Sequence, residues 1–173
     1  MRLRDSALAF GTISRVNHWL GAVLVLSMLA IGLYFPDLLP GPSRTFWRTL
    51  HIAIGTSLLP LVALRMLWRV TTHKPAAPAL ARAVQLLMIV TLAAMLASGV
   101  LMQWFDGRPI GLFELLRIAS PLTPSALWHE RMAGLHEALG WTLMALIVVH
   151  LLGVLKDRLV DGGAAWSRMA GRQ

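Results

Sequence analysis

Four long apolar stretches divide the chain, and polar or turn-forming segments separate them. The stretches cover approximately residues 17–39, 47–70, 80–104 and 132–155. A helix that crosses a bilayer needs about 20 mostly apolar residues, and each stretch is long enough. Proline and glycine mark the breaks, as in "PDLLPGPSR" and "DGRPIG". We find no internal repeat. The pattern predicts an all-α protein, a transmembrane four-helix bundle, with residues 1–173 forming a single integral-membrane domain.

Composition agrees with a membrane protein and removes several kinds of site. The chain is 57% hydrophobic and 14% charged, whereas about 25% of residues are charged in soluble domains. It contains no cysteine. Thiolate-held iron–sulfur clusters, covalently attached c-type haem and cysteine zinc sites are therefore excluded.

The basic residues predict the orientation of the helices in the membrane. Of the 16 lysines and arginines, eleven fall at the N-terminus, the second loop or the C-terminus, and five fall on the other side. Because lysine and arginine concentrate on the cytoplasmic side, both termini are expected there. The net charge of +8 is then explained by topology, and we expect no nucleic-acid partner. The five outer arginines are Arg44, Arg48, Arg108, Arg117 and Arg131.

Four of the six histidines lie inside the predicted spans, at His18, His51, His136 and His150. Ionisable side chains in a bilayer are costly and usually functional, although a histidine can also form a hydrogen bond between helices. His136 and His150 are fourteen residues apart, which is about 1400° of helix rotation and about 21 Å of rise. They therefore share one face of the fourth helix and lie near opposite membrane surfaces.

The direction of each span pairs the histidines by depth. His18 begins an outward span and His51 begins an inward one, so His18 matches His150 at the cytoplasmic level and His51 matches His136 at the outer level. Two imidazoles at each of two levels is the arrangement that two bis-histidine haems need. A bare metal site is disfavoured, because zinc prefers one compact tetrahedral set of ligands. His73 and His129 are expected in loops, as surface histidines.

Arginines and glycines accompany these histidines. Arg15 and Arg48 precede His18 and His51 by one turn, and Arg65 follows His51 by fourteen residues. Arginine binds carboxylates well, so these three are candidate partners of haem propionates. For Arg15 and Arg48, the alternative is that they extend to the membrane interface. Gly55 and Gly140, four residues after a histidine, would leave room for a flat macrocycle or for a neighbouring helix.

The motifs together resemble those of the bacterial cytochrome b561 family. They are "ISRVNHWL" at 13–20, "LHIAIG" at 50–55, "LRMLWR" at 64–69, "SGVLM" at 98–102 and "LHEALGWTLMALIVVHLLGVLKD" at 135–157. The resemblance covers nearly the whole chain. It implies four helices, two haem b groups and iron ligation by His18, His51, His136 and His150. Many members have a histidine where this chain has Gln85 or Asp157, which puts any quinone or proton role at these positions in doubt.

The resemblance also implies a function. We expect electron transfer across the bacterial inner membrane, between an outer donor and the quinone pool. Some members resemble superoxide oxidases, so superoxide or a redox protein is the candidate donor and ubiquinone the candidate acceptor. If the chain is an enzyme, it is an oxidoreductase of this superoxide:ubiquinone type. The alternative is a membrane-anchor cytochrome b subunit of a larger dehydrogenase or hydrogenase. A third class, a haem-free transporter or scaffold, also stays open. The long segment 105–131 is expected to cover the outer haem or to dock a partner.

Overall fold

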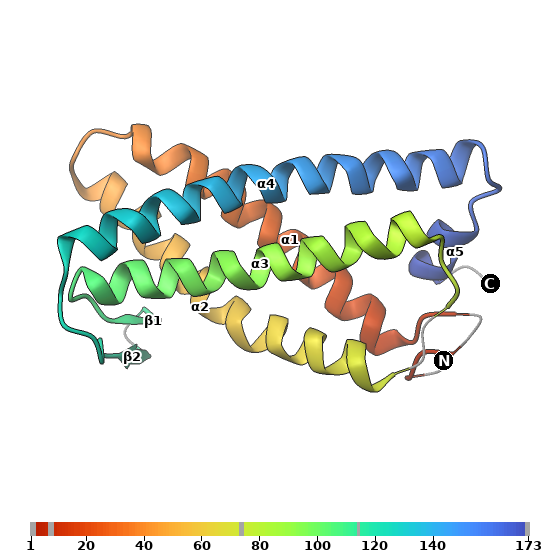
Figure 1. The fold of residues 1–173 in the computed structure, drawn as a ribbon, viewed down its shortest axis with the longest axis horizontal. Coiled ribbons are helices and arrows are strands. Elements are labelled where there is room, and N and C mark those ends of the chain that lie inside the picture. The colour runs from red at the N-terminus through yellow and green to blue at the C-terminus, as the bar shows by residue number, and fades with distance from the viewer. Residues whose placement is uncertain (1–2, 7–8, 73–74, 114, 172–173) are drawn as a thin grey trace.

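Four long helices dominate the structure (Figure 1). It is a computed structural model that describes residues 3–6, 9–72, 75–113 and 115–171; His73 lies outside these ranges. Within the described residues, four helices are long and apolar enough to cross a membrane, as predicted. Their bounds are α1 (Thr12–Tyr34), α2 (Pro42–Thr71), α3 (Ala79–Phe105) and α4 (Ala126–Leu159).

The helices run alternately up and down, and they associate as two pairs. The most extensive contacts join α3 to α4 and α1 to α2, with fewer between α2 and α3. One end of the bundle carries a small β-hairpin, and we call it the hairpin end; the other carries the short helix α5 (Ala164–Ala170), and we call it the tail end (Figure 1). The start of α1 and the end of α4 both lie at the tail end.

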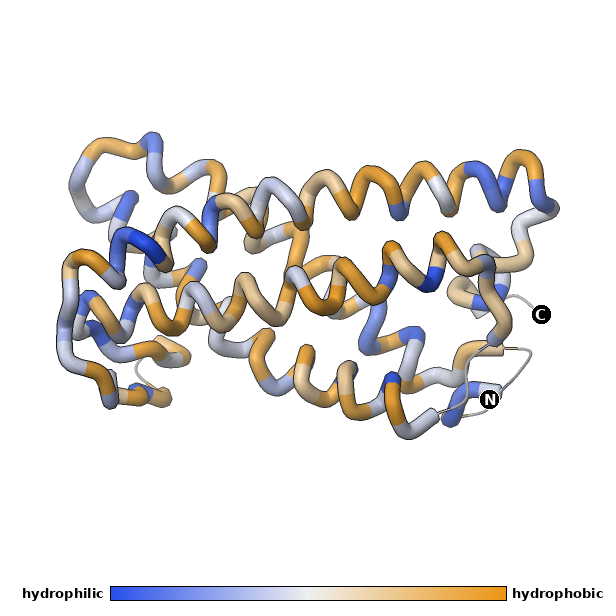
Figure 2. Tube along the Cα trace, viewed as in Figure 1, coloured by the Kyte–Doolittle hydropathy of each residue, from blue (hydrophilic) through white to orange (hydrophobic). Residues whose placement is uncertain are grey.

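Hydrophobic residues occur along the whole length of the four long helices (Figure 2), and many of them are exposed on the outside of the bundle. Few side chains are fully buried, and the largest are Leu58 of α2 and Leu143 of α4, which are 1% and 2% exposed. Large apolar residues such as Val23 and Leu152 are 61% and 59% exposed. Helices that are hydrophobic on all sides belong in a lipid environment, so the fold fits a membrane bundle.

Several of the helix ends differ from those predicted by four to six residues. The fourth helix begins at Ala126, six residues before the predicted start, because the Ser125 side chain accepts a hydrogen bond from the Trp128 N–H (3.5 Å) and caps it. The first helix begins at Thr12 and ends at Tyr34. It stops short of the predicted residue 39 because Pro36 belongs to a 3₁₀ turn over Phe35–Asp37.

The segment that we expected to be a long loop is largely structured. Strand β1 (Ile110–Leu112) pairs antiparallel with β2 (Leu116–Ile118), with Gly111 opposite Arg117. β1 packs against α2, and Ile110 is 5% exposed. The hairpin therefore covers part of α2 at the hairpin end.

The buried leucine Leu58 should contribute strongly to stability. Leu58→Ala is expected to lower the free energy of unfolding by about 2–5 kcal/mol, because it leaves a cavity among packed helices. Leu64→Ala on the same helix is the control, since Leu64 is 51% exposed and its loss leaves no cavity. Thermal unfolding in detergent measures both. Equal melting temperatures for the two variants would contradict the assigned packing.

Candidate functional site

The four predicted histidines form two pairs, one towards each end of the bundle. His51 of α2 faces His136 of α4, with ring centroids 6.1 Å apart. His18 of α1 faces His150 of α4, with ring centroids 6.4 Å apart. All four rings are partly buried. These are the partners that the spacing predicts, and α4 contributes one ring to each pair. The role of the rings as ligands stays a prediction.

The orientation of His136 is fixed by two groups of α3. Its Nδ1 lies 3.0 Å from the Met95 carbonyl oxygen and 3.2 Å from Ser98 Oγ. The Ser98 hydroxyl donates to the same carbonyl at 2.8 Å. Because a carbonyl only accepts hydrogen bonds, Nδ1 carries the proton and Nε2 holds the lone pair. Second-shell bonds of this kind orient a histidine that binds a metal through its other nitrogen.

Two glycines that sequence reasoning missed make room for the histidine rings. A Cβ at Gly99 of α3 would lie 3.1 Å from His136 Cε1, and a Cβ at Gly32 of α1 would lie 3.1 Å from His51 Cε1. Both glycines belong to a neighbouring helix, whereas the sequence analysis considered glycines on the histidine's own helix. The sequence feature that could have indicated these two glycines is that each lies four residues after a methionine.

Gly55 and Gly140 contact methionine side chains from the adjacent helices. A Cβ at Gly55 would lie 3.2 Å from Met28 Cε, and a Cβ at Gly140 would lie 3.6 Å from Met95 Cε. The two glycines therefore let α1 approach α2 and α3 approach α4. A role in accommodating a macrocycle stays a prediction for both.

At the tail end, Arg65 lies next to the histidine pair. Its Nη2 is 3.4 Å from His18 Nδ1, and its Nη1 is 3.4 Å from Asn17 Oδ1. Arg65 comes from α2, so the second helix reaches both histidine levels, through His51 and through Arg65. The guanidinium charge also interacts with His150. The cation therefore lies beside His18 and within electrostatic range of His150.

The other two predicted arginines lie near the ends of the bundle. Arg48 Nη2 donates to Gln103 Oε1 at 3.1 Å, and Gln103 of α3 is 4% exposed. Arg15 lies against the end of α5, where a Cβ on Gly171 would overlap its guanidinium. In the part of the chain that the structure describes, neither arginine is hydrogen-bonded to the paired histidine rings.

The tail helix α5 folds back onto the bundle, and Asp157 holds it there. The Asp157 carboxylate accepts hydrogen bonds from the backbone N–H groups of Ala165 (3.1 Å) and Trp166 (3.2 Å). The Trp166 ring contacts Trp19 of α1, with centroids 6.2 Å apart. Arg168 of α5 has a buried Nε without a hydrogen-bond partner in the part of the chain described. Asp157 thus has a structural role here, and Gln85 lies within α3.

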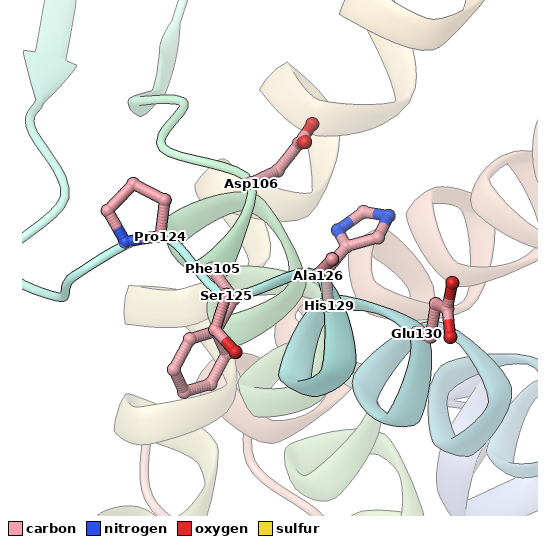
Figure 3. Close-up of a pocket in the computed structure, with 7 residues that line it drawn as sticks. All are labelled: Phe105, Asp106, Pro124, Ser125, Ala126, His129 and Glu130. Atoms are coloured by element: carbon pink, nitrogen blue, oxygen red, sulfur yellow. The ribbon is translucent and has the colours of Figure 1, made fainter.

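A pocket of about 280 Å³ opens at the hairpin end, where α3 meets the start of α4 (Figure 3). His129 lies in the first turn of α4, so the prediction that it belongs to a loop was wrong; its Nδ1 is 3.0 Å from the Met102 carbonyl oxygen. None of the paired histidines lines this pocket. The lining residues are Phe105, Asp106, Pro124, Ser125, Ala126, His129 and Glu130.

Comparison with known proteins identifies the family. The model of the family described as prokaryotic cytochrome b561 matches residues 9–172. The chain belongs to the prokaryotic cytochrome b561 family. It is also 30% identical to cytochrome b561 homolog 2 of Escherichia coli (strain K12), over 94% of this chain and 92% of that protein. Membership of the cytochrome b561 family implies a b-type haem and electron transfer across a membrane.

The glycine beside His136 offers a direct test of the site. Gly99→Val should displace the His136 ring, because even a Cβ would lie 3.1 Å from Cε1, and the purified protein should contain less haem. Gly153→Val is the matched control, since a Cβ at Gly153 meets nothing within 4 Å. Haem per protein is measured by visible absorption. The assignment of Gly99 is wrong if both variants retain the same haem content.

The contact between Asp157 and α5 predicts a second outcome. Asp157→Ala removes two acceptor contacts to α5, so trypsin should cleave after Arg168 several-fold faster in the intact protein. Asp161→Ala is the comparison, because Asp161 forms an exposed ion pair with Lys156 (2.6 Å) and an exposed pair contributes little. Mass spectrometry of timed digests follows the cleavage. Unchanged cleavage in Asp157→Ala would show that other contacts hold α5.

Proposed function

We propose that the chain holds two b-type haems, one at each histidine pair, and that it transfers electrons between a donor at the outer face and the membrane quinone pool. One observation carries this proposal: two facing pairs of imidazoles lie towards opposite ends of one bundle, and α4 supplies a ring to each. Such an arrangement provides a redox centre near each surface of the membrane.

The residues present fit bis-histidine haem. Nδ1 of His136 donates to a carbonyl, so Nε2 is available as a ligand. Nδ1 of His51 is buried and has no hydrogen bond of good geometry in the described chain, although the Met28 backbone of α1 interacts with this ring. The described residues contain no group of three or more histidine, aspartate or glutamate side chains that could hold a bare metal ion. When bound, haem supplies one-electron redox chemistry.

The four histidines would hold the two haems, His51 and His136 at the hairpin end and His18 and His150 at the tail end. A haem held by two histidines would supply electron transfer rather than oxygen chemistry. An imidazole that ligates iron through Nε2 carries a proton on Nδ1, so Arg65 cannot donate to it. Arg65 would then turn to another acceptor, and a propionate carboxylate has the matching charge.

The tail end is proposed to face the cytoplasm of a bacterium, with the protein spanning the inner membrane several times. Basic residues gather at this end, in keeping with the preference of lysine and arginine for the cytoplasmic side. Both chain termini then lie in the cytoplasm. The basic residues of the tail end that the structure describes include Arg15, Arg69, Lys156, Arg158 and Arg168.

Superoxide is one candidate donor at the hairpin end, and ubiquinone is the candidate acceptor. Basic residues could attract an anion there, yet Arg108 is already paired with Asp106 at 2.9 Å. Asp106 and Glu130 also line the pocket at this end. A redox protein therefore fits this surface as well as superoxide does.

One observation favours a second function, that of a membrane-anchor cytochrome b subunit for a larger dehydrogenase or hydrogenase. The β-hairpin exposes apolar side chains, with Phe113 52%, Leu115 91% and Ile118 42% exposed. An exposed apolar patch of this kind suits a partner subunit. Co-purification of a catalytic subunit with the native protein, together with inertness of the isolated chain, would favour this alternative.

The test combines spectroscopy with rapid kinetics. The purified protein should contain two haems per chain, and His136→Ala should lose one of them. Stopped-flow mixing with superoxide should reduce the haem, and added ubiquinone should re-oxidise it. A single haem in the native protein would refute the two-site proposal. Reduction without quinone-dependent re-oxidation would refute the proposed acceptor.

A further inference from the structure

The hairpin-end site is built from two copies of the same helix–helix contact. In one copy, Met28 and Gly32 of α1 pack against Gly55 and His51 of α2. The methionine precedes its glycine by four residues, and the histidine precedes its glycine by four residues. The second copy has the same spacings and the same partners, Met95 and Gly99 of α3 against Gly140 and His136 of α4.

The sequence alone does not reveal this repeat, because only four positions match and the two halves of the chain have no overall sequence similarity. In both copies a Cβ on the first-helix glycine would lie 3.1 Å from the histidine Cε1. If the surroundings of His51 and His136 were the same, the two rings would have the same basicity. A residue near the rings that differs between the two copies therefore makes their basicities differ.

One such difference is Ser98, three residues after Met95. The corresponding residue after Met28 is Ile31. Ser98 is 2% exposed, and its Oγ lies 3.2 Å from His136 Nδ1. The Met28 backbone interacts with His51 as the Met95 backbone does with His136. However, His51 Nδ1 has no hydrogen bond of good geometry among the described residues, and no hydroxyl takes the place of Ser98 Oγ. A hydrogen-bond acceptor on the outer nitrogen raises the basicity of a ligating histidine, so Ser98 and the Met95 carbonyl favour the oxidised form of the iron.

The tail-end site has the opposite environment. The Arg65 guanidinium lies 3.4 Å from His18 Nδ1, and its charge interacts with both His18 and His150. None of the salt bridges in the described part of the chain involves Arg65. If Arg65 pairs with a haem propionate as proposed above, its charge offsets that of the carboxylate and still favours the reduced state. For His51 and His136, the charge interactions in the described chain involve no arginine or lysine. A nearby positive charge stabilises the reduced state, which carries one more electron.

We infer that Ser98 and Arg65 set a potential difference between the two sites, with the hairpin-end site the lower, so that electrons move from the hairpin end to the tail end. This inference rests on the proposed pair of haems. In each transfer, the hairpin-end site loses one electron to the tail-end site, and the donor and the quinone restore the two starting states. Both residues act by positioning and charge, because neither is an iron ligand.

Redox titration of the purified, haem-loaded protein tests the inference by visible and low-temperature EPR spectra. The haem that is lost in His136→Ala should have the lower midpoint potential. Ser98→Ala should raise that midpoint, with two haems still bound and the other midpoint unchanged. Ser57→Ala is the control, since the Ser57 hydroxyl donates only to the Ala53 carbonyl of its own helix (2.9 Å). Arg65→Gln should lower the higher midpoint.

A variant in the α1–α2 copy tests the inference even if Ser98→Ala loses haem. Ile31→Thr keeps a branched side chain and adds a hydroxyl at the position equivalent to Ser98, and it should lower the hairpin-end midpoint. The inference is overturned if the His136-dependent haem has the higher midpoint. It is also overturned if the Ser98 and Ile31 variants leave the potentials as Ser57→Ala does. Absence of a second haem in the native protein would instead refute the proposed function.

Discussion

The need to hold imidazole rings inside an apolar bundle governs the rest of this structure. A polar ring nitrogen removed from water is costly unless it has a hydrogen-bond or metal partner. A ring also needs space, which a helix backbone provides only where a neighbour has no side chain. The bundle meets both needs across helix pairs: α3 provides the Met95 carbonyl and the space at Gly99, and α1 provides the space at Gly32.

These requirements explain why the helices associate as α1 with α2 and α3 with α4. Each pair brings a methionine of one helix into contact with a glycine of the other, at Gly55 and at Gly140. Lipid gives little hydrophobic drive for helices to associate, so close packing at small residues is a main source of cohesion. The same small residues that hold the pairs together therefore place the histidines.

Much of the architecture could be predicted from the sequence, because spans and helical spacing depend on local properties. The partners of His136 and His150 followed from helix geometry and the alternating direction of the spans. The roles of Gly32 and Gly99 could not be predicted in this way, because they depend on which helix faces which. His129 was predicted to lie in a loop because the apolar pattern of the fourth span begins near residue 132. The Ser125 cap starts α4 at Ala126, and the apolar pattern gives no indication of this earlier start. The packing of α5 depends on Asp157, whose backbone partners eight and nine residues away leave no sign in the sequence.

The 34-residue helix α4 carries a ring for each site on one continuous backbone. Adding or deleting one residue between His136 and His150 would rotate one ring by about 100° relative to the other. Substitutions of apolar residues on the lipid-facing side leave that angle unchanged. The segment between the two histidines can therefore change its composition during evolution far more easily than its length.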